Sequence, residues 1–397
     1  MFTHSSCHHA NNHTLSSLKV ELLSGEVLTN LTKLSMLAPP FDADAKSIQD
    51  IIDAKESYVK FSPVKSAGIE ARRILFLLLA DTNRSPFLHG VHNKSKSIPL
   101  KNTVDEQSMM LLPQLSKALH CMLGNQGYAP SFKILLGKCL RATPELVPHF
   151  FSGLQLSDAK PSYRSLAALT FIEGVLREAP LPPVTSRSLP MKHLISSLFP
   201  SCITKLLLGK IIQSQCSLLV SSELKLIISI LRRGIAFTTI ARTDTISDRA
   251  SADQWKSSIS QAIIGHIPEV TLLLSIPNRF DPFMHDATSF SNSFVVMLLC
   301  EALQCFTLLD PSLMKNVKFD WTKLVPNEND GQKMNGRVFS NAEPLLQQRI
   351  LNCLYLLSCR SLVAYSTKLL PNVISILIST TIPEVYTNAR NLALVLM

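Results

Sequence analysis

Hydrophobic residues recur at helical spacing along most of the chain, and the clearest case is SLLVSSELKLIISILRRGI, residues Ser217–Ile235. Its apolar side chains fall at the three-, four- and seven-residue intervals of one helix face, at Leu224, Ile227, Ile228, Leu231 and Ile235. Leu226 and Ile230 add a second apolar flank. Two such flanks on one helix predict that it is covered from both sides, as in a layered all-helical protein.

The two ends of this segment predict where the helix begins and stops. A serine at position 221 or 222 can cap its amino end. Arg232 and Arg233 suit the negative carboxyl end of the helix dipole, and Gly234 can adopt the left-handed conformation that closes a helix. We therefore expect the helix to end near residue 235.

Other segments share this periodicity, and no convincing strand separates them. Three of them close on Leu-Arg, at residues 141, 177 and 232, with intervals of 36 and 55 residues. The shorter interval is near the length of a two-helix HEAT or armadillo unit. We expect an all-α fold, an irregular armadillo- or HEAT-like α-solenoid, with a compact irregular helical bundle as the alternative. The expected helices are Ile69–Asp81, Met109–Leu123, Ser131–Arg141, Ser162–Glu178, Met191–Leu198, Ser201–Ile212, Trp255–Ile264, Ser293–Leu309, Arg349–Ser358, Leu370–Ser379 and Tyr386–Met397.

Polar stretches divide the chain into an expected N-terminal segment, residues 1–66, and a helical-repeat domain, residues 67–397. The first segment is polar, and we expect it to be partly disordered. Within the domain, polar inserts predict long loops near 85–105, 236–253, 277–292 and 326–342. A membrane-spanning helix needs roughly 20 consecutive apolar residues, and charged or polar residues or a proline break each apolar run. We therefore expect no transmembrane segment.

Composition narrows the class of protein. With 46% hydrophobic residues, the chain is too apolar to be disordered as a whole, and only 13 glycines among 397 residues disfavour a nucleotide-binding enzyme built on glycine turns. The net charge of +10 suits an acidic partner such as nucleic acid, although the basic residues are scattered and also suit a solvated surface. The nine cysteines form no CxxC motif and mostly lie in apolar patterns. They indicate reduced, buried thiols in a cytosolic or nuclear protein.

No motif for catalysis or cofactor binding occurs in the sequence, so we expect no enzyme activity and no cofactor. Cys7, His8, His9 and His13 could offer zinc ligands, but their spacing does not match a zinc finger, and we expect no metal site. Several ring side chains lie beside apolar segments and favour packing over chemistry. These are His120, His149, Phe150, Phe151, Trp255 and Trp321.

The segment Leu198–Arg233, with KPSYRSLAALTFIEGVLREAP upstream, resembles the N-terminal helical region of the nucleolar pre-ribosomal-associated protein 1 (unhealthy ribosome biogenesis protein) family. The phrases that carry the resemblance are Pro200–Lys205, Leu218–Val220, Leu231–Arg233 and, downstream, Phe319–Leu324. The similarity covers roughly Ile69–Leu324. Family members are several times longer and this chain ends within an apolar helical pattern, so we expect a fragment.

The resemblance implies a non-catalytic scaffold in the nucleolus. Such a scaffold joins precursors of the large ribosomal subunit and supports maturation of 5.8S and large-subunit rRNA. The expected partners are pre-ribosomal proteins and pre-rRNA, contacted indirectly or electrostatically, with no membrane and no small-molecule substrate. The alternatives are a karyopherin-like armadillo or HEAT adaptor that binds protein segments, and an enzyme with an unrecognised site.

Four cations at the expected helix ends are candidates for contact with RNA phosphates: Lys205, Lys210, Arg232 and Arg233. Compensation of the helix dipole and solvation explain the same residues without RNA.

Overall fold

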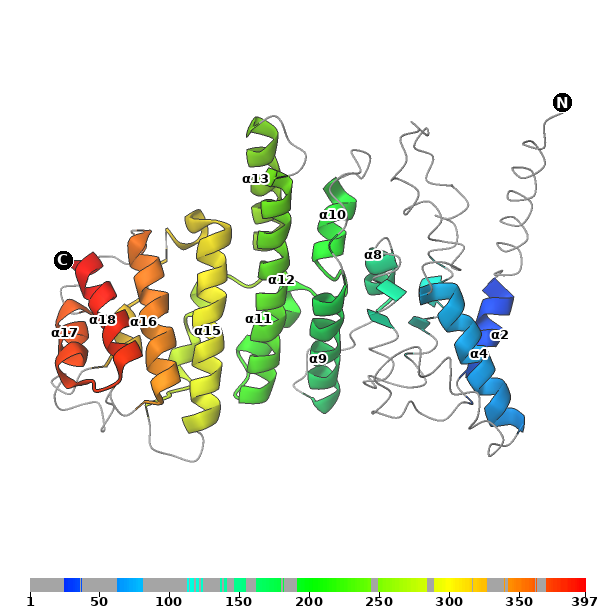
Figure 1. Ribbon diagram of the computed structural model, residues 1–397, viewed down its shortest axis with the longest axis horizontal. Coiled ribbons are helices and arrows are strands. Elements are labelled where there is room, and N and C mark those ends of the chain that lie inside the picture. Colours follow the sequence, from blue (N-terminus) through cyan, green and yellow to red (C-terminus); the bar gives the residue numbers. More distant parts are fainter. Residues whose placement is uncertain are drawn as a thin grey trace, which may run out of the picture. The chain divides into compact units, whose positions relative to one another are not determined.

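The computed structural model is helical throughout the residues that it describes, and no strand occurs among them (Figure 1). These residues are 25–35, 63–80, 146–154, 162–179, 191–243, 249–283, 289–315, 317–326, 342–360 and 369–397, with scattered positions between 113 and 140 and single residues at 37, 181, 339 and 362. They divide into two compact units. The first unit comprises Met1–Gln155, Gly174–Pro182 and Pro190–Cys202, and the second comprises Leu156–Glu173, Pro183–Leu189 and Ile203–Met397. The all-α prediction is confirmed for the described part of the chain.

In the first unit, helix α2 (Gly25–Ser35) packs against helix α4 (Pro63–Ala80). Leu28 is buried, and the Arg72 guanidinium donates a hydrogen bond to the Ser35 carbonyl over 3.2 Å. The expected domain boundary at 66/67 therefore falls inside α4. Part of the N-terminal segment forms a helix that packs on the domain.

Helices α8 (Leu146–Gly153) and α10 (Met191–Leu198) also contact each other in this unit. Phe150 and Phe151 are fully buried, which confirms their predicted role in the core. The His120 ring stacks on the Phe150 ring with centroids 4.8 Å apart, and its Nε2 lies 2.8 Å from the Phe150 carbonyl oxygen. His120 is thus a packed and hydrogen-bonded side chain, as predicted.

The second unit contains a series of longer helices. Helices α12 (Ser217–Thr243), α15 (Ser289–Leu309) and α16 (Pro344–Cys359) lie side by side in Figure 1. Helix α15 packs against both α12 and α16, and α16 packs against α18 (Pro383–Leu396). Helix α9 (Tyr163–Glu178) contributes its residues up to Glu173. The remaining elements are α11 (Lys205–Ile212), α12 (Ser217–Thr243), α13 (Arg249–His266), α14 (Val270–Leu273), α15 (Ser289–Leu309), α16 (Pro344–Cys359), α17 (Leu369–Ser379) and α18 (Pro383–Leu396), with short 3-10 turns η3 (Ile276–Asn278), η4 (Pro311–Met314) and η5 (Trp321–Leu324).

Local sequence explains several of these starts. Thr204 caps α11 by accepting a hydrogen bond from the Leu207 backbone N–H over 3.2 Å. Pro344 occupies the first position of α16, where its missing N–H leaves no helical hydrogen bond unmade. Trp321 begins η5 and is buried with its ring 4.9 Å from the Phe319 ring, so its predicted packing role is confirmed.

Two expectations about α12 are wrong. The helix continues through Gly234 to Thr243, and α13 begins at Arg249, so the insert expected at 236–253 is helical except for residues 244–248, which lie outside the described part. Gly234 is buried within the helix, and a Cβ there would lie 3.2 Å from the Ile263 Cδ1 atom of α13. The glycine therefore lets neighbouring helices approach α12 closely, and it does not terminate the helix.

The other expected inserts are only partly described. The insert at 277–292 ends early, because α15 begins at Ser289 and residues 276–278 form η3. The expected insert at 85–105 lies outside the described residues. So do residues 327–338 of the insert expected at 326–342.

Helix α15 has the length and mean hydropathy, 1.6, of a helix that could cross a membrane, which the sequence analysis did not anticipate. However, 67% of its apolar window is buried inside the protein. Core helices pass the same test of length and composition. The burial of α15 against α12 and α16 accounts for its apolar composition.

Candidate binding face

Helix α12 reaches the surface along one line of side chains. Its exposed residues recur every seven positions, at Leu218, Lys225, Arg232 and Thr239. The half-buried residues 222, 229 and 236 lie between them. Most other described positions of the helix are buried. Ile227 and Ile228 are among them, which confirms the prediction that the helix is covered from both sides.

Helix α15 presents a matching line beside it. This line begins at Phe290 and ends at Leu308, which are exposed, and between them it runs through four half-buried residues, Phe294, Met297, Glu301 and Gln304. The Lys225 Nζ atom lies 5.1 Å from the centroid of the Phe294 ring, and Arg232 Nη2 donates to Glu301 Oε1 over 2.5 Å. Arg232 follows Lys225 by seven residues on α12, and Glu301 follows Phe294 by seven residues on α15. The two helices therefore run parallel, and their two lines of side chains stay in register.

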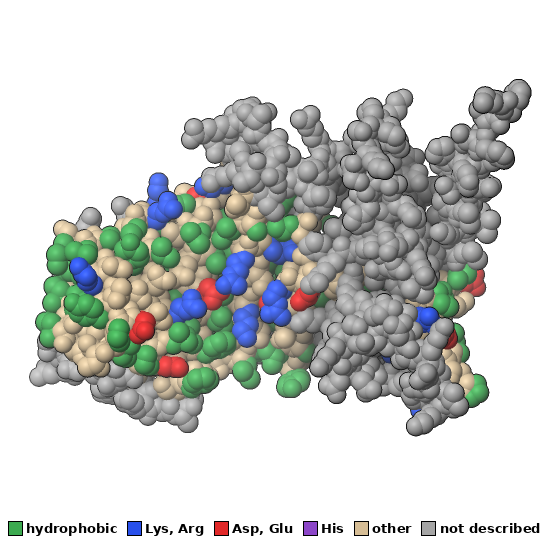
Figure 2. All heavy atoms as spheres, in the orientation of Figure 1, with side chains coloured by type: hydrophobic (Ala, Val, Ile, Leu, Met, Phe, Trp, Pro, Cys, Tyr) green, Lys and Arg blue, Asp and Glu red, His purple; other side chains and the backbone are tan. Residues whose placement is uncertain are grey.

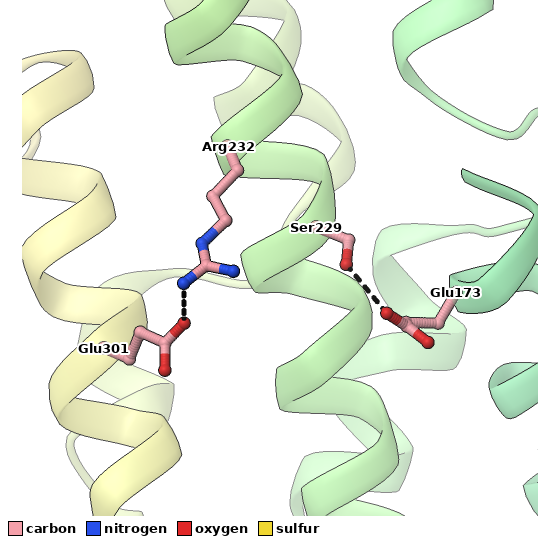
Figure 3. A network of polar contacts seen from close by, with 4 residues as sticks. All are labelled: Glu173, Ser229, Arg232 and Glu301. Carbon is pink, nitrogen blue, oxygen red and sulfur yellow. Dashed lines mark hydrogen bonds and ion pairs between the residues drawn. The ribbon is translucent and has the colours of Figure 1, made fainter. Parts of the chain in front are cut away.

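Helix α9 adds a contact on the other side of the α12 line (Figure 3). The Ser229 hydroxyl donates to Glu173 Oε1 over 3.2 Å, while Arg232 reaches from α12 to Glu301 on α15. We call Glu173 of α9 together with the lines of α12 and α15 the binding face. Figure 2 shows basic side chains gathered around acidic ones near the middle of the visible face of the molecule, with hydrophobic side chains around them.

The sequence analysis missed the cross-helix partners Lys225, Phe294, Glu301 and Glu173. Their signal is the seven-residue spacing of Leu218, Lys225, Arg232 and Thr239, which only becomes visible once α12 is known to extend past Gly234. Nothing in the local sequence indicates which residue of another helix each of them faces.

Lys205 and Lys210, two of the predicted phosphate contacts, lie on α11. Lys205 Nζ is 3.6 Å from Glu269 Oε1, in a pair whose two side chains are both largely accessible to solvent. Such exposed pairs contribute little to stability and open readily. Lys210 is exposed in the last turn of the helix, where its charge also suits the helix dipole.

The two arginines behave differently from each other. Arg232 is exposed but hydrogen-bonded to Glu301. Arg233 is buried, and burial lowers its pKa to about 10. Arg233 therefore does not lie at an exposed helix end, and we do not propose it as a phosphate contact. The reason is the continuation of α12, which places residue 233 on an inward face instead of at a helix end.

Glu223 is the most unusual ionisable group in α12. It is 0% exposed, and neither carboxylate oxygen has a hydrogen-bond partner among the residues that the structure describes. Burial raises its pKa well above the ordinary value of a glutamate, because desolvation disfavours the charged form. The structure thus places an acidic side chain in the core of the second unit.

The described cysteines are free thiols, of which Cys139, Cys300, Cys305 and Cys353 are buried, Cys202 is partly buried, and Cys216 and Cys359 are exposed. The side-chain hydrogen bond between Cys353 and Cys300 and the burial of the thiol both raise the pKa of Cys353. Burial raises the pKa of Cys139 to about 12. These thiols suit packing better than nucleophilic chemistry, which needs the thiolate.

Within the described residues, no group of three or more His, Cys, Asp or Glu side chains could hold a metal ion. Cys7, His8, His9 and His13 lie outside these residues, as does the side chain of Trp255. Comparisons with protein-family models, with curated proteins and with solved structures found no match for this chain.

Proposed function

We propose that this chain is a non-catalytic scaffold that joins nucleolar precursors of the large ribosomal subunit and supports maturation of 5.8S and large-subunit rRNA. The resemblance through Pro200–Arg233 and Phe319–Leu324 supplies the functional class. In the structure these segments form α11 with the residues that precede it, the first two thirds of α12 and the buried turn η5.

The observation that carries the proposal is the parallel pair α12 and α15, each of which exposes one line of side chains. Parallel helices of this kind arise when similar helical units are stacked, and stacked units offer long surfaces to partners. We therefore also propose that the helices form an irregular armadillo- or HEAT-like α-solenoid. The enzyme alternative has no comparable support.

Any direct contact with RNA in this proposal is electrostatic. Lys210 is the best candidate, because it is exposed, and Lys205 is second because its exposed pair with Glu269 can open. Arg232 is held by Glu301 and contributes less. Each phosphate contact to a single strand changes the logarithm of the binding constant by about 0.7 per decade of salt.

Sedimentation of nuclear extracts tests the scaffold. The protein should migrate with large particles, and ribonuclease should shift it to lighter fractions. A protein that sediments alone with or without ribonuclease, or that is excluded from nucleoli, would contradict the proposal. The karyopherin-like adaptor predicts instead that the protein forms smaller complexes, whose sedimentation ribonuclease does not change.

A charge reversal on the purified chain separates direct from indirect RNA contact. Lys210→Glu should weaken binding to single-stranded RNA and reduce the salt slope by about 0.7. Lys318→Glu, an equal change at another exposed site, is the matched control. Equal effects of both substitutions would show that only net charge matters.

A further inference from the structure

The first turns of α12 and α15 carry exposed apolar side chains beside a lysine. Leu218 is 63% exposed and Phe290 is 75% exposed, although both belong to helices that are otherwise largely buried. Lys225 is exposed, and Phe294 is half-buried beneath it. We call Leu218, Lys225, Phe290 and Phe294 the Lys225 patch.

The register of the two helices brings these residues together. Leu218 precedes Lys225 by seven residues, about 10 Å along the helix, and Phe290 precedes Phe294 by four residues, about 6 Å. Because Lys225 lies over Phe294 and the helices are parallel, both exposed apolar side chains lie on the same side of the ammonium group. Packed helix axes are separated by about 8–10 Å, so Leu218 and Phe290 are close enough to contact one inserted side chain.

Among the described residues, no carboxylate compensates the charge of the patch. The nearest acidic residue on the α15 line, Glu301, accepts a hydrogen bond from Arg232, and Glu173 accepts one from Ser229. Among the described residues, Lys225 contacts an aromatic ring and no carboxylate. An ammonium group has three N–H donors, and the ring does not satisfy them all. The patch therefore combines an apolar contact surface with a free positive charge.

We propose that the Lys225 patch docks an acidic segment of another protein, with an apolar side chain between Leu218 and Phe290 and a carboxylate on Lys225. Charge complementarity favours this occupant, because a carboxylate supplies what Lys225 lacks. A nucleic acid fits less well, since proteins that bind single strands combine stacking rings with a positively charged groove along the backbone, whereas the patch has one cation and Leu218 offers no ring for stacking. The surface serves either a ribosomal scaffold or an adaptor, so the proposal does not depend on the nucleolar assignment.

Fluorescence anisotropy on the purified full chain tests this docking. The probe is a short labelled peptide in which Asp and Glu alternate with Leu and Phe, and the matched peptide has Asn and Gln in place of Asp and Glu. We expect the acidic peptide to bind at least tenfold more tightly than the neutral one. Lys225→Glu should weaken the acidic peptide about tenfold, the equivalent of about 1.4 kcal/mol, while Lys318→Glu, which changes the net charge equally, should not.

The apolar half of the patch has its own test. Leu218→Gln combined with Phe290→Gln should weaken binding about tenfold, the loss expected when a central apolar contact is removed. Leu308→Gln is the matched control, because Leu308 is 57% exposed at the other end of α15. Circular dichroism checks that all variants remain helical.

Three results would overturn the proposal. One is equal binding of the acidic and neutral peptides, and another is an equal effect of the patch and control substitutions. The third is that the chain does not bind the acidic peptide but binds polyuridylic acid, and that a substitution of Lys225 weakens this RNA binding. Because these measurements use purified protein, they are independent of whether the chain enters nucleoli.

Discussion

At the scale of the residue, Glu223 couples the stability of the second unit to pH. Its carboxylate is buried and has no hydrogen-bond partner within the part of the chain that the structure describes, and burial raises its pKa. The carboxyl group of Glu223 therefore binds its proton more tightly in the folded protein than in the unfolded chain. Consequently the free energy of unfolding falls as pH rises from the unfolded pKa, near 4.3, toward the raised folded value.

Glu223→Gln should remove this loss, because the amide stays neutral at every pH in the window. The variant should be more stable than the wild type at neutral pH, and the difference should shrink toward pH 4. The wild type should lose about 1.4 kcal/mol for each pH unit inside the window. Urea unfolding at several pH values measures the free energy of unfolding of both proteins. Glu384→Gln, at an exposed position of α18, is the control, and an identical pH dependence of wild type and Glu223→Gln would contradict the prediction.

Gly153 has a similarly local role in the first unit. A Cβ at this position would overlap the His120 ring, at 2.8 Å from its Cδ2 atom. The ring cannot move aside easily, because it stacks on Phe150 and bonds to its carbonyl group.

Gly153→Ala should therefore destabilise the protein by about 1–3 kcal/mol, the usual cost of overpacking. Gly265→Ala in α13 is a matched control with open space around the new methyl group, and it should stabilise by up to about 1 kcal/mol through helix propensity. Thermal unfolding compares the two. A Gly153→Ala variant as stable as Gly265→Ala would show that His120 adapts.

At the scale of the element, α12 holds the second unit together because helices pack against it on several sides. It contacts α11, α13 and α15, and its inward positions are filled by Leu and Ile. A helix covered in this way derives its stability from packing more than from intrinsic propensity.

Ile227→Ala should therefore cost about 2–5 kcal/mol, because it deletes fully buried methyl groups. Leu218→Ala on the exposed line of the same helix should change stability by less than about 0.5 kcal/mol. Chemical denaturation followed by circular dichroism gives both values. Similar costs at the two positions would mean that α12 is not buried as described.

At the scale of the whole molecule, the proposed α-solenoid makes a prediction about dimensions in solution. A compact globule of this length has a radius of gyration of about 21 Å. Stacked helical units spread in one direction, so small-angle X-ray scattering of the monomer should give a clearly larger value. A radius near 21 Å would instead favour the compact helical bundle.

Prediction from sequence worked best where burial alone sets the pattern. The spacing of Leu and Ile indicated the helices and the inward side chains Ile227 and Ile228, and the structure confirms both. Helix α10 has the predicted bounds, and the other predicted helices that the structure describes differ mainly at the ends. The predicted helices Met109–Leu123 and Ser131–Arg141 lie largely outside the described residues, and α2, α8 and α14 were not predicted. Periodicity succeeds here because every turn of a packed helix records which side faces the core.

The candidate site was harder to predict, because each of its properties depends on another helix. Local sequence made Gly234 a terminator and Arg232 and Arg233 helix-end cations. Instead, α13 and α15 pack beside α12, so that Gly234 becomes a contact point, Arg233 is buried and Arg232 bonds to Glu301.

The sequence by itself thus determined that the described part of the chain is helical and which Leu and Ile residues of α12 face inward. Tertiary structure alone decided where α12 ends, which cations remain free for a partner, and that Glu223 is buried. The physical reason is that the hydrophobic periodicity of a helix depends only on residues within that helix. Charge compensation and close packing depend on atoms of other segments, tens of residues away in the sequence.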